Sequence, residues 1–245
     1  MSADLVRTLG STTIDRASIR LSATLLLTGQ LLYILVTQFH AGGEANNHPE
    51  IFAKYASSES WKAVHVAQFL AMAVIIAGLV VFYLALDLPV GSAAWAARLG
   101  AVSGVLALVL YAVLQAVDGI GNKEVDGAWV SAPAADESAR FASAEAMRWL
   151  EWGVRSYHDY ALGLALLLLA AGTLRTVGLP AMIGYLMGLS GIAYLVQGWV
   201  VGSEGFSETH TVLILVAWIV SIAWMVWLLV VARRMRASEP PSSVG

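Results

Sequence analysis

Six long apolar segments determine which architectures this chain can adopt. Each is about as long as the roughly 20 residues that a helix needs to cross the hydrocarbon core of a bilayer. They cover residues 21–40, 63–86, 96–118, 150–174, 178–202 and 210–232. Helices are expected, because backbone amides must be paired within lipid and the segments lack strand-like alternation. The sequence therefore predicts an all-α polytopic membrane protein, a six-helix transmembrane bundle over residues 21–232.

The composition supports this class of protein and excludes several others. Only 13% of the 245 residues are charged, about half the share that is usual in a soluble domain. The net charge of −3 argues against a nucleic-acid partner, so the expected partner is the lipid bilayer. The chain has no cysteine, which excludes disulfides, thiolate metal sites and cysteine nucleophiles.

The distribution of charge predicts how the bundle is oriented. With the N-terminus inside, the inner side holds eight basic and four acidic residues, and the outer side holds six basic and thirteen acidic residues. This bias predicts a multi-pass protein of a bacterial-type plasma (inner) membrane with both termini cytoplasmic. Residues 1–20 then form a cytoplasmic N-terminal segment, and residues 233–245 form a disordered cytoplasmic tail. The two long connections, 41–62 and 119–149, become outer loops.

All five histidines fall on this predicted outer side, at the ends of spans or in the loops beyond them. They are His40, His48, His65, His158 and His210. Histidine binds metals, carries protons and ligates cofactors at neutral pH. His40 and His48 fit solvated positions at a span end and in a loop, whereas His65 and His158 are predicted to lie below the level of the lipid headgroups. His210 also fits a polar residue in the first turn of the sixth span, where Glu208 suits the start of a helix.

Other polar residues accompany the histidines in the outer halves of the spans, and polar residues inside spans usually face a bundle interior or a water-filled cavity. Those predicted to bind a ligand are Gln68, Gln115, Glu151, Arg155, Asp159 and Gln197. Glu151 and Arg155 are four residues apart and can pair. The inner halves carry no comparable set, which predicts a pocket that is open to the outside and closed below. The second, third, fourth and sixth spans are expected to build it.

The leading hypothesis for this pocket is a metal or cofactor site with His65, Asp118, His158 and His210 as metal ligands. Histidines with carboxylates suit zinc, copper or non-haem iron, and two facing histidines suit haem. No HExxH sequence, histidine pair one helical turn apart or haem-attachment motif is present. The residues therefore indicate a site without showing whether the chain is an enzyme.

Two further classes of function stay open on the same residues. One alternative is a solute-binding or pH-coupled transport protein whose pocket binds a small molecule from the outer side. The second alternative is a non-catalytic accessory subunit of the membrane. A stripe of small residues on the fifth span, Gly184, Gly188 and Gly191, fits packing within the bundle and also fits a homo-oligomer interface. No motif is specific enough to name a family.

Overall fold

The computed structural model describes residues 15–44, 46–86, 88 and 90–235. Over these residues the regular structure is entirely helical, which confirms the all-α prediction. The elements are α2 (Arg16–Thr37), α3 (His48–Ser57), α4 (Trp61–Ala85), α5 (Ser92–Ala116), the π-helical segment η1 (Val117–Asn122), α6 (Lys123–Val130), α7 (Glu137–Thr173), α8 (Ala181–Glu204) and α9 (Glu208–Arg234). The predicted tail beyond residue 235 and residues 1–14 of the predicted N-terminal segment lie outside the described residues.

Five of these helices are long and apolar enough to cross a membrane by length and composition. They are α2, α4, the continuous helix Ser92–Val130 that joins α5, η1 and α6, α8 and α9. Helix α7 has 37 residues but does not belong to this group, because polar residues continue into its middle. Several apolar helices of this length indicate a multi-pass membrane protein.

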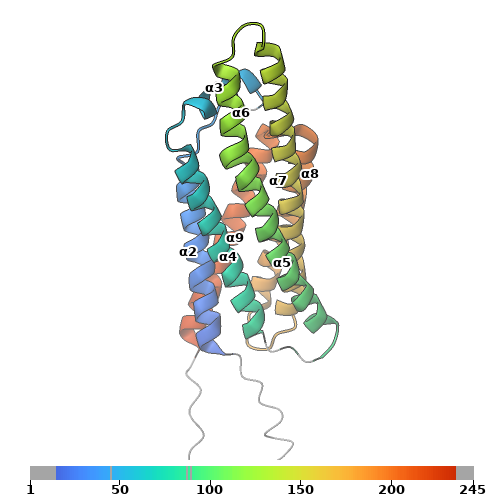
Figure 1. Cartoon of the computed structure of the whole chain (residues 1–245). Helices are drawn as coiled ribbons and strands as arrows, with labels where there is room; N and C mark the ends of the chain where they lie inside the picture. The colour runs from blue at the N-terminus through green and yellow to red at the C-terminus, as the bar shows by residue number, and fades with distance from the viewer. Residues whose placement is uncertain (1–14, 45, 87, 89, 236–245) are drawn as a thin grey trace, which may run out of the picture.

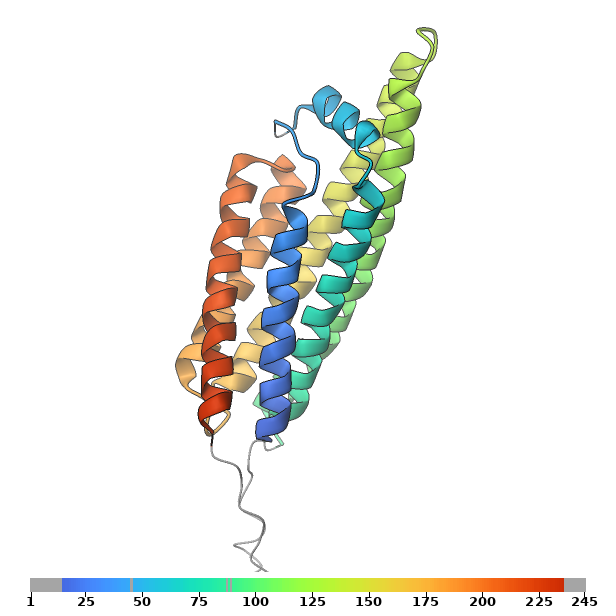
Figure 2. The same ribbon diagram turned by 90° about the vertical axis from the view of Figure 1, so that its left-hand side faces the viewer.

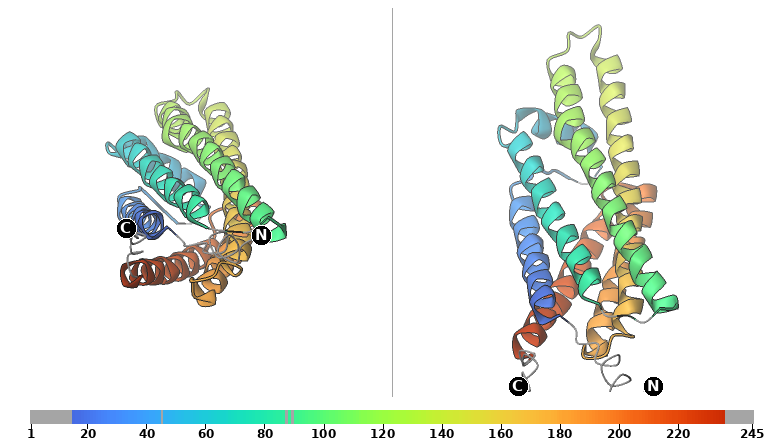
Figure 3. Two further views of the ribbon diagram at one scale, coloured as in Figure 1. Left: turned by 90° about the horizontal axis from the view of Figure 1, so that it is seen from below. Right: turned by 60° about the horizontal axis from the view of Figure 1, so that its bottom comes forward.

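The six long helices form a closed ring in which neighbours along the chain are also neighbours in space (Figure 3). The ring closes where α9 returns to α2, and Nε of Arg16 donates to the carbonyl of Ala232 at 3.3 Å. The start of α2 and the end of α9 therefore lie at the same end of the bundle, which we call the proximal end. The opposite end, where α2 ends and α4 begins, is the distal end (Figure 1).

Glycines allow the ring helices to approach closely. A Cβ atom added at Gly191 of α8 would lie 2.8 Å from the carbonyl oxygen of Gly163 on α7, and one at Gly184 would lie 2.8 Å from Leu174 Cγ. The glycine stripe predicted on the fifth span thus packs against α7 within the chain. Such close backbone contact is a common way to associate helices in lipid.

The distal end carries a second layer of structure. Helix α3 lies across this end of the bundle, and α6 and the first part of α7 extend beyond the other helices (Figure 2). Helix α7 begins at Glu137 in this region. A separate apolar core joins the layer to the ring through Ile51, Phe52, Tyr55, Trp61 and Ala144.

Candidate metal centre

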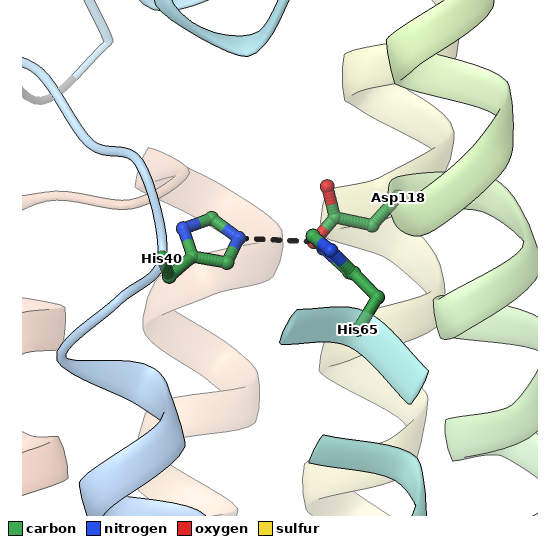
Figure 4. A group of neighbouring side chains, drawn as sticks. All are labelled: His40, His65 and Asp118. Atoms are coloured by element: carbon green, nitrogen blue, oxygen red, sulfur yellow. Dashed lines mark ion pairs between the residues drawn. The ribbon is translucent and has the colours of Figure 1, made fainter. Parts of the chain in front are cut away.

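Two histidines and one aspartate meet at the distal end of the ring. The Nε2 atom of His65 lies 3.0 Å from Oδ2 of Asp118, and Nε2 of His40 lies 3.7 Å from the same oxygen (Figure 4). One ligand atom from each residue lies within 4.8 Å of the other two. Among the described residues this is the one group of three or more histidine or acidic side chains that can share a metal ion.

The three residues come from three different parts of the chain. His40 belongs to the loop that follows α2, His65 to the second turn of α4 and Asp118 to the π-helical segment η1. π-Helical segments inside α-helices are rare and occur frequently at functional sites. Here η1 carries Gly119, where an added Cβ would lie only 2.7 Å from Cβ of His65. The absence of a side chain at this position lets η1 approach α4 and brings Asp118 next to His65.

Trp61 fixes both His65 and the backbone of Asp118. Its indole Nε1 donates to the Asp118 carbonyl at 3.1 Å, and its own carbonyl lies 2.7 Å from Nδ1 of His65. A carbonyl only accepts, so the hydrogen-bonding pattern assigns a proton to Nδ1. In neutral His65 the lone pair of Nε2 then faces a carboxylate oxygen. Two such acceptors 3.0 Å apart need a proton or a metal ion between them.

A buried polar network holds the other side of Asp118. Asn122 donates from Nδ2 to Oδ1 of Asp118 at 3.1 Å and to Oε2 of Glu151 at 2.7 Å. Arg148 donates from Nη1 to the same Glu151 oxygen at 2.6 Å and to the hydroxyl of Tyr55 at 3.0 Å. With Oδ1 held by Asn122, Oδ2 is left to face the two histidines. Such outer partners orient metal-binding side chains in known metalloproteins.

The geometry suits a small divalent metal ion. Ligand atoms at about 2.1 Å from a tetrahedral zinc ion are separated by about 3.4 Å. The two nitrogen–oxygen separations, 3.0 and 3.7 Å, lie on either side of this value. Three protein ligands leave a fourth coordination position for water or another molecule, which is the arrangement of catalytic rather than structural zinc sites. Two histidines and one carboxylate are also the ligand set of many non-haem iron(II) sites.

A cavity of about 290 Å³ opens beside this group, inside the distal half of the ring. His40 and Asp118 both line it, so an ion held by them borders the cavity. All four predicted walls contribute, since α4, α5, α7 and α9 supply lining residues. Helices α2 and α3 and the loop between them also take part, which the sequence did not indicate.

The predicted ligand-binding residues occupy different places around this cavity. Gln68, Gln115, Glu151 and Arg155 line it. Asp159 is buried behind Arg155 and accepts from its Nε at 3.1 Å. Gln197 is buried on α8 and donates to the Leu213 carbonyl, and it does not belong to the cavity lining.

The predicted metal ligands separate into two groups. His65 and Asp118 meet, whereas His158 and His210 are not members of the cluster. Nδ1 of His158 lies 2.9 Å from the Ala107 carbonyl. His210 lines the cavity, and its backbone amide donates to the hydroxyl of Ser207 at the start of α9.

Two details differ from the interpretation of the sequence. Neither His40 nor His48 is solvated. The His40 side chain is only 21% exposed and belongs to the cluster. The His48 side chain is 13% exposed, and its Nδ1 lies 3.1 Å from Oε1 of Glu145. Glu151 pairs with Arg148 on the preceding turn, while Arg155 pairs with Asp159 on the following turn. Glu151 can pair with Arg148 three positions before it or with Arg155 four positions after it. Asn122 from η1 donates to the same Glu151 oxygen as Arg148, which favours the pairing with Arg148.

No family model matches the chain, and no similar protein was found among curated proteins or solved structures. The site geometry is therefore the basis for any functional assignment.

Proposed function

We propose that this chain is a multi-pass membrane protein that binds one divalent transition metal ion through His40, His65 and Asp118. The observation that carries the proposal is the approach of Nε2 of His65 to Oδ2 of Asp118 while Nδ1 is held by a backbone carbonyl. This is how metal-binding histidines are commonly oriented. Zinc and iron(II) both suit two imidazoles and one carboxylate. His40 and Asp118 also line a cavity that can admit a small molecule.

Zinc binding tests this proposal directly. We expect detergent-purified protein, stripped with a chelator, to bind one zinc ion per chain in calorimetric titration. His40→Ala is expected to lower the affinity at least about 100-fold, because loss of an outer partner alone usually costs 10–100-fold. His48→Ala is the matched control, since His48 is at the same end of the bundle but pairs with Glu145 outside the cluster. Equal affinities of wild type and His40→Ala would refute the assignment, as would no binding of zinc, copper, cobalt or iron(II).

We further propose six membrane spans, with α7 as the fourth, and cytoplasmic termini in a bacterial-type inner membrane. The distal end and its metal centre then face the outside. The arginines at or near the proximal end support this orientation. They are Arg16, Arg20, Arg98, Arg175, Arg233 and Arg234.

Labelling of single cysteines tests the orientation, because the natural chain contains no cysteine to interfere. Ala134 lies exposed in the distal connection between α6 and α7, and Ser92 lies exposed at the proximal start of α5. In intact cells a membrane-impermeant maleimide is expected to label Ala134→Cys, and to label Ser92→Cys only after permeabilisation. The reverse pattern would place the metal centre on the cytoplasmic side.

A further inference from the structure

Arg155 lines the cavity with hydrogen-bonding capacity that the protein does not use. Its side chain is 13% exposed, and it donates from Nε to Asp159 and from Nη1 to the hydroxyl of Tyr33. Within the described part of the chain its Nη2 makes no hydrogen bond. A guanidinium carries five N–H donors, so Arg155 can still donate to a group that enters the cavity. Asp159, itself fully buried, fixes the orientation of the guanidinium from behind.

The charges around the cavity favour an anion once a metal is bound. Three carboxylates, those of Asp118, Glu151 and Asp159, accompany two guanidinium groups, those of Arg148 and Arg155. The net charge of this set is −1, and a divalent cation changes it to +1. In a region of low dielectric constant, the sign of this net charge affects the binding of an ion more strongly than it does in water.

We propose that the cavity binds a small organic anion whose oxyanion group, a carboxylate or a phosphoryl group, is held by Arg155. This inference rests on the proposed metal site, because the bound ion supplies the positive charge and a second contact for an oxygen of the ligand. Arginine is suited to this role, since its planar fork matches the geometry of carboxylates and phosphates.

The rest of the lining indicates the remainder of the ligand. Leu114, Ile214 and Trp218 contribute apolar surface. The volume of about 290 Å³ is at the lower end of the range for small-molecule sites. A ligand with a short apolar chain fits such a volume, whereas a diacyl lipid does not.

Butyrate, inorganic phosphate and butyramide are suitable probes, because butyramide has nearly the shape of butyrate without its charge. We expect zinc-loaded protein to bind butyrate or phosphate saturably, and at least about tenfold more tightly than butyramide. The variant Arg155→Gln/Asp159→Asn removes the charge pair without leaving one charge buried alone, and we expect it to lose this preference. Arg140→Gln, an exposed arginine on the same helix, is the matched control and is expected to behave as wild type.

The failure of this inference and the failure of the metal proposal can be told apart. If wild type binds zinc but shows no preference for butyrate or phosphate over butyramide, or if the double variant keeps the preference, the anion inference is wrong and the metal site stands. The double variant could also lose zinc binding while its melting temperature equals that of wild type. The fold would then be intact and the charge pair would act on the metal and not on the anion. That result would overturn the inference. Anion binding that needs Arg155 but persists unchanged after chelator treatment would refute the contribution of the metal.

Discussion

Asp118→Asn is expected to abolish measurable zinc binding while leaving the bundle folded. Asp118 contributes the only negative charge among the three proposed ligands, and its Oδ2 faces both histidines. Asparagine has the same shape, so packing around η1 is retained, but the amide is a poor ligand. We expect the affinity to fall by more than the roughly 10–100-fold that loss of an outer partner costs. Calorimetric titration of the stripped proteins measures the difference.

Asn122→Ala is expected to weaken zinc binding less than Asp118→Asn does. Asn122 donates to Oδ1 of Asp118 and is not one of the three proposed ligands, so its removal should reorient the carboxylate without removing a ligand. A loss of about 10–100-fold is expected, smaller than that of Asp118→Asn. The alternative to a metal is a second proton on His65. In that case no variant changes zinc affinity, and Asp118→Asn instead lowers the melting temperature of the chelator-treated protein by breaking an ion pair.

The sequence predicted the helices because each apolar segment is long and its boundaries are marked by polar residues. The predicted segment 63–86, for example, corresponds to α4, Trp61–Ala85. The same reasoning placed Gln68, Gln115, Glu151 and Arg155 on helix faces that now line the cavity. A polar residue in an apolar helix must face the interior, so its direction follows from the helical period.

Other features of the site depend on contacts that no helical period encodes. His40 lies in the loop that follows α2, and only the path of residues 38–44 brings it to Asp118. The π-helical turn of η1 changes the register in which Asp118 leaves the helix, and a pattern based on the α-helical period does not reveal it. Gly119 makes space for His65 on another helix, and nothing in the residues around Gly119 indicates this role.

Arg148→Met is expected to be the most destabilising of the single substitutions considered for the network behind the metal site. Arg148 and Glu151 are each about 3% exposed, and Arg148 is the cation that compensates the Glu151 carboxylate at 2.6 Å. Removing one partner of such a buried pair leaves an uncompensated charge, which usually costs about 3–5 kcal/mol. The free energy of unfolding in mixed micelles, titrated with a denaturing detergent, measures the loss.

Two comparisons separate the buried charge from lost packing. Arg148→Met/Glu151→Gln removes both charges, and we expect it to recover most of the lost stability, since replacing a buried ion pair by neutral groups is often close to neutral. Lys62→Met breaks an exposed pair with Glu124, whose side chains are 63% and 67% exposed, and should cost less than about 1 kcal/mol. If the double variant is as unstable as Arg148→Met, the stacking of Arg148 on Phe206 and Tyr55 is the more important contribution. In that case the main role of the charge pair is to orient Asp118 and not to stabilise the fold. Glu151 accepts a hydrogen bond from Asn122, and Asn122 in turn donates to the carboxylate of Asp118.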